Sequence, residues 1–199
     1  MQWNLNGYYN NYEELRQLIS LKQPRIICLQ ETRLHPHHTP KLNSYQIHRF
    51  AYTNALIAAE GVATLIHNSI ILKDSIQLNT NIQNITLRIK TCHPLPTLEF
   101  TICNIYLPPH TEPEYADLCS LVAQLPQLFI LLGDCNVHST SWGSYKINTK
   151  GKLFDKLLQQ HPQLFLLNNN KSTRFNISNG TSSAIDLSIS STNLGHLLS

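Results

Sequence analysis

Apolar residues in this chain come in short runs, and the length of those runs limits what the chain can fold into. The longest, such as Leu128 to Leu132, stop after about five residues. A membrane-spanning helix needs roughly 20 apolar residues in a row, so we expect no membrane span. Short runs rich in Ile, Leu, Val or Phe and bounded by polar residues or proline are typical of buried strands. The predicted strands are Arg25 to Gln30, Val62 to His67, Ile82 to Lys90, Leu98 to Leu107, Leu128 to Leu132, Leu164 to Asn168 and Ala184 to Ile189.

Three stretches with helical spacing lie between these strands. One is predicted to begin at Asn11, with Glu14 completing a capping box, and another at Thr111, with Glu114 in the same role. A third is predicted near Thr149 to Gln160. Strands with interspersed helices predict an α/β fold in which two sheets pack face to face as a β-sandwich flanked by helices. A simple doubly wound sheet is the alternative.

Composition favours a single domain, residues 1–199. The chain has 199 residues, of which 42% are hydrophobic, and we find no linker, repeat or composition break. The formal net charge of +3 permits a polyanionic partner without requiring one. The N-terminus lacks the basic start and apolar stretch of a signal peptide, so we expect a protein that is not secreted. We accordingly discount the glycosylation triplets at Asn84, Asn170, Asn176 and Asn179.

The cysteines are odd in number, unevenly spaced and embedded in apolar runs. This pattern indicates reduced thiols rather than a disulfide scaffold or a zinc site. They are Cys28, Cys92, Cys103, Cys119 and Cys135.

Three of the twelve acidic residues adjoin predicted strands, namely Glu31, Asp134 and Asp186. A carboxylate beside a buried strand is costly unless a metal or hydrogen-bond donors compensate its charge. We therefore predict that the three share a site at one edge of the sheets. The alternative is that each caps a turn, which is ordinary for an Asp that follows Gly.

Amide and phenol side chains stand close to these acids in the sequence. Asn4 and Asn6 follow a short apolar start, Tyr106 ends a long strand, and Asn136 lies two residues after Asp134. Such groups are donors suited to phosphate oxygens. An oxygen-rich set of this kind favours magnesium over zinc.

Five segments occur in the order found in the endonuclease/exonuclease/phosphatase superfamily, and the chain resembles that superfamily. More closely, it resembles the endonuclease domain at the start of the polyprotein of jockey-type non-LTR retrotransposons, in which His-Ser-x-x-Trp-Gly-Ser and Gly-Thr-x-Ser-Ala-Ile-Asp-Leu are typical. Here these motifs occupy residues 138–144 and 180–187. The five segments are Gln-Trp-Asn-Leu-Asn-Gly, Ile-Cys-Leu-Gln-Glu-Thr, Ile-Tyr-Leu-Pro-Pro, Leu-Gly-Asp-Cys-Asn-Val-His-Ser and Ser-Ala-Ile-Asp-Leu-Ser.

The resemblance implies a DNase I-like four-layer sandwich and a role for each acid. It implies Mg²⁺, or alternatively Mn²⁺, held by Glu31 with Asn4 near the metal. It implies that Asp134 aligns or activates the attacking water. The remaining implied roles are hydrogen bonds from Asn136 and Tyr106 to the phosphate, and orientation of a catalytic histidine by Asp186.

Further residues flank the motifs and are candidates for contact with the substrate: Asn6, Arg33, His138, Ser139 and Trp142. For His138 and Ser139 we favour positioning or packing, and for Trp142 we favour packing over stacking on a nucleotide. The histidines of the tract Leu34 to Pro40 are interpreted as a surface loop rather than a metal site. Basic residues that could contact phosphates as a group are Arg33, Lys41, Arg49, Lys146, Lys150, Lys152, Lys171 and Arg174.

The chain also departs from the pattern of the family. The family closes with Ser-Asp-His after a further strand, whereas this chain reaches Ser199 before such a motif, and Gly-His-Leu-Leu around His196 does not match it. We therefore expect a domain that is incomplete at both ends and lacks its last strand. Smaller departures are Glu60, where relatives often carry Gly, and Cys135, where Phe is common.

The leading hypothesis is a Mg²⁺-dependent DNA endonuclease that nicks target DNA to prime reverse transcription of a retrotransposon. It implies double-stranded DNA as partner, a reverse transcriptase domain downstream in the full polyprotein, and action in the nucleus after synthesis in the cytoplasm. One alternative is a catalytically inactive copy that retains metal or DNA binding. Another is a phosphoesterase of the same fold with a different substrate.

Overall fold

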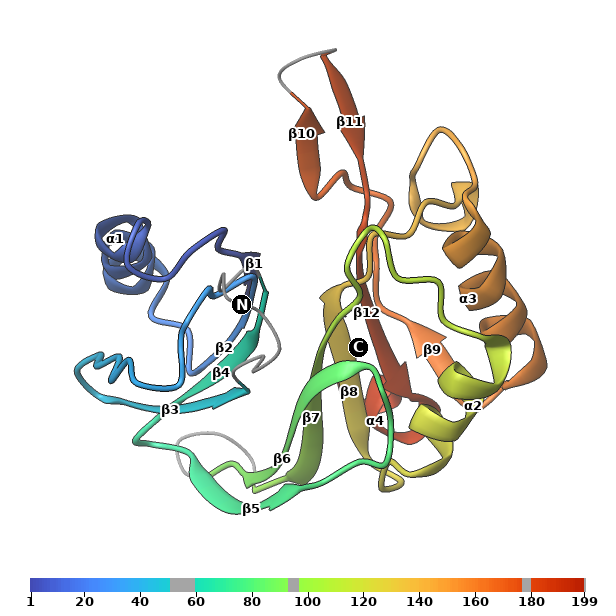
Figure 1. The fold of residues 1–199 in the computed structure, drawn as a ribbon. Helices are drawn as coiled ribbons and strands as arrows, with labels where there is room; N and C mark the ends of the chain where they lie inside the picture. Colours follow the sequence, from blue (N-terminus) through green and yellow to red (C-terminus); the bar gives the residue numbers. More distant parts are fainter. Residues whose placement is uncertain (51–59, 93–96, 177–179, 199) are drawn as a thin grey trace.

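The computed structural model describes residues 1–50, 60–92, 97–176 and 180–198. One of its two main sheets has four strands, and helix α1 (Tyr12–Lys22) covers the outer face of this sheet (Figure 1). Its strand order is β1 (Gln2–Asn4), β2 (Ile26–Gln30), β4 (Val62–His67) and β3 (Tyr45–Phe50). Strand β1 runs parallel to β2, and β4 runs antiparallel to both of its neighbours.

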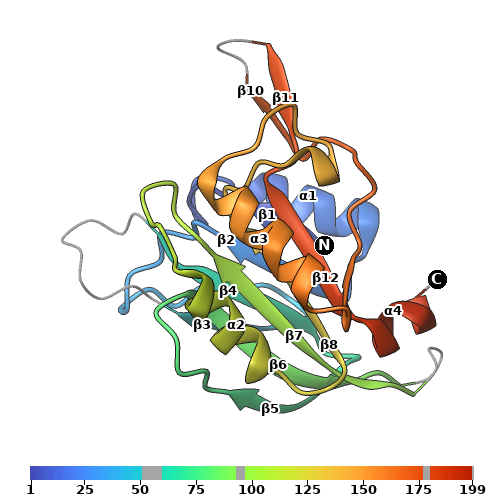
Figure 2. The ribbon, with the colours of Figure 1, turned by 90° about the vertical axis from the view of Figure 1, so that its right-hand side faces the viewer.

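The second main sheet has six strands and packs against the first. Figure 2 places helices α2 (Tyr115–Ala123) and α3 (Thr149–Gln160) side by side over its outer face. Strand order is β5 (Ile71–Ile76), β6 (Gln83–Lys90), β7 (Glu99–Tyr106), β8 (Phe129–Asp134), β12 (Asp186–Ser191) and β9 (Leu164–Leu166). The remaining elements are the 3-10 turn η1 (Thr140–Trp142), the hairpin β10 (Arg174–Asn176) with β11 (Thr181–Ser183), and α4 (Thr192–Leu198). Helix, sheet, sheet and helices form four layers, which confirms the predicted sandwich.

The core is divided among the three interfaces between these layers. Ile66, Leu87 and Ile89 fill the space between the two sheets and are essentially inaccessible to solvent. Leu15 anchors α1 to the four-stranded sheet. Phe154 anchors α3 to the six-stranded sheet. Burial of such side chains stabilises the fold by roughly 1.5 to 3 kcal/mol each.

One buried polar side chain joins the two sheets. Asn104 on β7 is fully buried, and its amide nitrogen donates to the carbonyl of Ala63 on β4 at 2.9 Å. Its amide oxygen accepts from Gln30 Nε2 on β2 at 2.6 Å. Because a buried amide is tolerated only when it is hydrogen-bonded, these contacts restrict how the sheets can be placed against each other.

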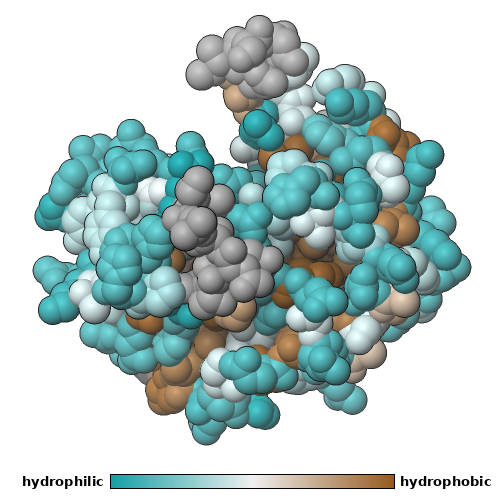
Figure 3. Space-filling model, in the orientation of Figure 1, coloured by the Kyte–Doolittle hydropathy of each residue, from teal (hydrophilic) through white to brown (hydrophobic). Residues whose placement is uncertain are grey.

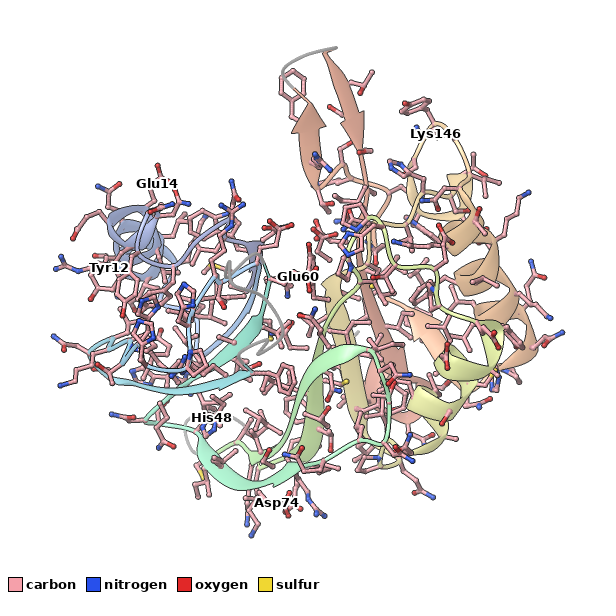
Figure 4. All side chains as sticks on the ribbon, in the orientation of Figure 1. Tyr12, Glu14, His48, Glu60, Asp74 and Lys146 are labelled. Atoms are coloured by element: carbon pink, nitrogen blue, oxygen red, sulfur yellow. The ribbon has the colours of Figure 1, made fainter. Side chains whose placement is uncertain are left out.

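The predicted strands all have counterparts in the structure, and β4 and α3 begin and end at the predicted residues. Both predicted capping boxes are wrong. The side chain of Asn11 makes no capping hydrogen bond, and Glu14 projects from the outer side of α1 (Figure 4). Helix α2 begins at Tyr115 rather than near Thr111, with Glu114 as its N-cap and a capping box formed with Asp117. The later start has a local cause, since Pro113 disfavours helical geometry at the residue before it.

Several short or polar strands were not predicted, including β1, β3 and β5. Strand β3 lies at the edge of its sheet, and its residues are exposed or half-buried rather than fully buried. No helix in the described part of the chain is long and apolar enough to cross a membrane.

Candidate functional site

A pocket at one edge of the sandwich, between the ends of the two sheets, is lined by six of the predicted site residues: Asn4, Asn6, Glu31, Asp134, Asn136 and Asp186. The pocket has a volume of about 720 Å³. The surface around this pocket is mainly hydrophilic (Figure 3). Its lining comprises Gln2, Trp3, Asn4, Asn6, Glu31, Pro109, Asp134, Asn136, Asn168, Thr173, Arg174, Phe175, Ile185, Asp186 and Ser188.

Strand register brings residues distant in the sequence to this edge. Parallel pairing of β1 with β2 sets Asn4 beside Gln30, immediately before Glu31. Parallel pairing of β7 with β8 sets Tyr106 beside Asp134. Antiparallel pairing of β12 with β8 sets Asp186 on the other side of Asp134. Neighbouring strands lie about 4.8 Å apart, so the pairing alone places these side chains within reach of one another.

The amide of Asn4 links the acids of the two sheets. Its nitrogen donates to Glu31 Oε1 at 2.8 Å and to Asp134 Oδ2 at 2.7 Å. The hydroxyl of Tyr106 also donates to Glu31 Oε1, at 2.8 Å. Both of these hydrogen bonds end on Oε1, and no described residue donates to Oε2, which can therefore face another ligand.

Asp134 is the most buried acid of the site, with 2% of its surface exposed. Burial raises the pKa of its carboxyl group, and the hydrogen bonds from Asn4 and from the backbone N–H of Asn136 oppose that rise. Burial, together with the hydrogen bond to Glu31, also raises the pKa of Tyr106 far above its usual range. The Tyr106 hydroxyl is thus protonated at neutral pH and serves as a hydrogen-bond donor.

The backbone at the ends of the strands takes an unusual conformation. Glu31 has a φ of 49° and Asn136 a φ of 50°, both in the left-handed region. Asn tolerates this region, whereas a residue such as Glu adopts it at a cost. The backbone N–H of Gly7 and the N–H of Tyr8 donate to the carbonyls of Glu31 and Thr32, at 2.8 Å each, and hold the turn.

Asp186 has a partner that was not predicted. Gln2 Nε2 donates to Asp186 Oδ1 at 2.9 Å, and Asn168 Nδ2 donates to the Asp186 backbone carbonyl. Burial raises the pKa of Asp186 to about 6, against the lowering effect of hydrogen bonds from Thr173 and Gln2. In the described part of the chain, an amide rather than an imidazole thus contacts this carboxylate.

Two further predicted residues lie at the rim. Asn6 lines the pocket, and its Oδ1 accepts a hydrogen bond from the Arg33 guanidinium. Glu60 contacts Arg33, because the Glu60 carbonyl accepts a hydrogen bond from the Arg33 N–H. The Glu60 carboxylate accepts a hydrogen bond from Gln83 and lies 3.5 Å from His110 Nε2. Figure 4 places Glu60 between the two sheets.

The structure places the other candidate substrate contacts inside the protein. Trp142 and Ser139 are fully buried, and the Ser139 hydroxyl donates to Asp155 at 2.7 Å. His138 is half-buried with its Nδ1 enclosed, and burial lowers the pKa of its imidazole. Their positions match the packing roles favoured above, and none of the three lines the pocket.

Two of the basic residues grouped as phosphate contacts are otherwise engaged. Lys150 is 2% exposed, and its ammonium donates to the carbonyls of Pro108 and Pro109. Arg49 donates to three backbone carbonyls of the tract from His35 to His38. Burial rules out the predicted phosphate contact for Lys150, whereas Arg49 remains partly exposed. Arg174, in contrast, lines the pocket.

Sequence reasoning missed Gln2, Thr173 and Phe175 as pocket residues. Phe175 is 62% exposed on the hairpin beside Arg174. A local signal existed only for Gln2, which belongs to a motif segment.

The described residues contain no group of three or more His, Cys, Asp or Glu side chains arranged to hold a metal ion. Oxygen donors at the pocket are Glu31, Asp134 and the amide oxygens of Asn4 and Asn136. A carboxylate with a free oxygen beside amide oxygens fits a hard cation that keeps several waters, such as Mg²⁺.

The fold and the order of these residues define the class of protein: the chain has the fold of the endonuclease/exonuclease/phosphatase superfamily. Residues 100–197 match the family model described as endonuclease-reverse transcriptase. The resemblance seen in the motifs is therefore confirmed. A comparison with curated protein sequences gave no match.

Solved structures of several activities share this fold. The endonuclease domain of TRAS1, a telomere-specific non-LTR retrotransposon, is 22% identical, with a TM-score of 0.76 over 98% of this chain and 86% of that chain. A 3'-5' exonuclease from Neisseria meningitidis is 17% identical, with a TM-score of 0.72 over 98% and 87%. A mannosyl-6-phosphatase from Bacteroides thetaiotaomicron is 16% identical, with a TM-score of 0.63 over 96% and 84%. These relatives are hydrolases of phosphoester bonds.

Proposed function

We propose that the chain is a divalent-metal-dependent phosphodiester hydrolase that nicks double-stranded DNA. The observation that carries the proposal is the link made by Asn4 between Glu31 and Asp134, which gathers two acids from different sheets at one polar pocket. Acids held this way supply the water activation and charge neutralisation that phosphodiester hydrolysis needs.

Glu31 is the residue best placed to hold the metal. The donors Asn4 and Tyr106 occupy one of its carboxylate oxygens and orient the other. A bound Mg²⁺, with Mn²⁺ as the alternative, would neutralise charge on the phosphate. Asn4 positions the Glu31 carboxylate, and its own oxygen accepts from the Asn6 N–H at 3.2 Å.

Asp134 is the proposed acid or base for the attacking water. Its two carboxylate oxygens each accept a hydrogen bond, one from Asn4 and one from the Asn136 N–H, so the group is held in a fixed direction. Its raised pKa brings it nearer to neutral pH, where a general base works best. Deprotonated Asp134 would orient a water against the phosphorus and accept its proton.

Asn136 is the proposed donor to the phosphate oxygens, and Tyr106 would join it by turning its single O–H from Glu31 toward the phosphate. The Tyr106 hydroxyl stays protonated, as its raised pKa requires. The Asn136 amide donates one hydrogen to the carbonyl of Leu107 at 3.1 Å and has a second hydrogen free for a ligand. Fixed donors of this kind stabilise charge that develops in the transition state.

The DNA-facing surface is proposed to include Asn6 and Arg33 on one side of the pocket and Arg174 on the other. Guanidinium groups suit backbone phosphates. The match to the endonuclease-reverse transcriptase family and the likeness to the TRAS1 endonuclease domain support a role in retrotransposition. In that role the nick would supply a 3′ hydroxyl that primes a reverse transcriptase, in the nucleus.

A phosphomonoesterase is the second candidate, and the likeness to a mannosyl-6-phosphatase favours it. The test incubates the chain with supercoiled plasmid and, separately, with mannose 6-phosphate, each with Mg²⁺ or with EDTA. The proposal expects Mg²⁺-dependent conversion of supercoiled to open-circular plasmid without release of inorganic phosphate from the sugar. Phosphate release without nicking would replace it with the second candidate. Inactivity on both substrates, with folding verified by circular dichroism, would favour a catalytically inactive copy.

A further inference from the structure

A second group of reactive side chains lies on the outer face of the six-stranded sheet. Cys119 is on α2 and His161 is the C-cap residue of α3, and these two helices lie next to each other (Figure 2). The sulfur of Cys119 is 3.6 Å from His161 Nε2. The other imidazole nitrogen, Nδ1, is 3.1 Å from Nε2 of the Gln163 side-chain amide.

The three residues have the relation of a nucleophile, a base and a group that orients the base. We propose that Cys119 is an activated thiol and that this face is a site of covalent modification by small disulfides.

The backbone holds the imidazole in place. The His161 N–H donates to the Leu157 carbonyl at the end of α3, and the Leu164 N–H donates to the His161 carbonyl at 2.9 Å. The Gln163 carbonyl accepts from the Thr192 N–H at 2.8 Å, which ties the same turn to the start of α4. The contact between sulfur and imidazole thus rests on three backbone hydrogen bonds.

A pocket of about 380 Å³ opens beside the thiol. Val122, Leu125 and Phe129 provide its apolar wall, while His161 and Gln163 provide polar groups. A small disulfide with an apolar body would fit against this wall with one sulfur at Cys119. The pocket lies on a different part of the molecule from the acidic site and shares no lining residue with it.

The groups near the thiol include one lysine and one tyrosine. Lys156 on α3 places its ammonium 4.1 Å from the centre of the Tyr115 ring, one helical turn before Cys119. Partial burial, and then Cys119, raise the pKa of Tyr115 above its ordinary value. From β12 and α4, the pocket receives the uncharged residues Ser191, Thr192 and Asn193.

The other thiols differ in their surroundings. Cys28, Cys103 and Cys135 are fully buried, and burial raises the pKa of each, to about 12 for Cys28 and Cys103. Cys119 is only partly buried and touches an imidazole. Since the thiolate is the reacting species, the reactivity of the folded protein should concentrate at Cys119.

The reaction balances without a further oxidant. The Cys119 proton passes to His161 Nε2, and the thiolate attacks one sulfur of the disulfide. A new S–S bond forms to Cys119 while the original S–S bond breaks and releases a thiolate. Nε2 can accept this proton when Nδ1 carries the ring hydrogen, which requires the exposed Gln163 amide to rotate so that its oxygen, in place of its nitrogen, faces Nδ1.

The test uses Cys92→Ser as background, because Cys92 is also partly buried. The rate of reaction with an aromatic disulfide that releases a coloured thiolate, 5,5′-dithiobis(2-nitrobenzoic acid), is measured from pH 6 to 9.5 and mapped by mass spectrometry. At pH 6.5, we expect Cys119 to react about tenfold faster than in His161→Gln, with the two rates converging at high pH. His67→Gln, on the other sheet, is the control and should leave the rate unchanged.

A second measurement tests the proposal without His161→Gln, in case that variant does not fold. In the Cys92→Ser protein, which retains His161, Cys119 of the folded protein at pH 6.5 should react faster than Cys119 of the same protein unfolded in 8 M urea. Equal rates for His161→Gln and its parent, or slower reaction of folded than unfolded Cys119, would overturn the proposal.

Discussion

Gln2 donates a hydrogen bond of 2.9 Å to the carboxylate of Asp186, which lies 184 positions later in the chain. The bond joins β1, an edge strand of one sheet, to β12 of the other sheet, and both residues line the pocket. It gives the buried acid a donor that favours its charged form.

Replacing Gln2 with Leu should therefore destabilise the folded protein mainly where Asp186 is ionised. A hydrogen bond to a charged group contributes about 1.5 to 3 kcal/mol, so we expect a loss of that order at pH 8 and a smaller loss at pH 4. Urea unfolding at both pH values measures it. Gln17→Leu, at an exposed position of α1, is the control. An equal loss at both pH values would contradict the role given to this bond.

Asp186→Asn should stabilise the metal-free protein above pH 7. Asp186 has a raised pKa of about 6 in the folded protein, against 3.8 as its ordinary value, so the folded state binds more protons between these two values. Its contribution to stability is therefore complete below about pH 4 and is lost as pH rises through 6. We expect the variant to gain about 1 to 3 kcal/mol at pH 8 and little at pH 4, measured by urea unfolding in EDTA. A variant less stable than the parent at pH 8 would contradict this sign.

Asn104→Leu should weaken the joint between the sheets. The substitution removes the bonds to Ala63 and Gln30 and takes from the buried Gln30 amide the partner of its nitrogen. We expect a loss of about 2 to 4 kcal/mol in the free energy of unfolding. Asn84→Leu is the control, because among the described residues its side chain bonds with Ile82 and Thr86, each two positions away, and not with the other sheet. A loss no larger than that of the control would show that the Asn104 hydrogen bonds do not hold the two sheets together.

The sequence predicts those parts of this arrangement that depend on neighbouring residues, and it does not predict contacts between residues far apart in the chain. Glu31 and Asp134 are predictable because each directly follows or ends a buried apolar run, and motif order assigns both to one site. Asn104 is not, since within an apolar strand nothing local reveals that it meets Ala63, 41 positions away. The partner of Asp186 likewise follows from strand register between distant segments.

Lys150 illustrates the same limit. A lysine near a motif reads as a surface phosphate contact, yet the fold of α3 turns it inward to the carbonyls of Pro108 and Pro109. Charge in a sequence does not reveal which face of a helix will be covered.

Lys150→Met should consequently loosen the loop at the pocket, because it keeps the apolar stem and removes the donors. We expect a loss of about 1 to 3 kcal/mol in stability and several-fold slower turnover, since Pro109 lines the pocket. Lys152→Met, exposed on the same helix, should change neither. Thermal unfolding and plasmid nicking measure the two effects. Wild-type stability of Lys150→Met would contradict the structural role.

The central claim is that Glu31 and Asp134, joined by Asn4, form a metal-dependent hydrolytic site. Its most direct test is the single-turnover rate of Mg²⁺-dependent plasmid nicking by Glu31→Gln and Asp134→Asn, beside Glu14→Gln on the exposed side of α1 (Figure 4). We predict that each of the first two variants lowers the rate by about 100-fold or more while Glu14→Gln leaves it unchanged. Nicking by folded Glu31→Gln and Asp134→Asn at the wild-type rate would contradict the account.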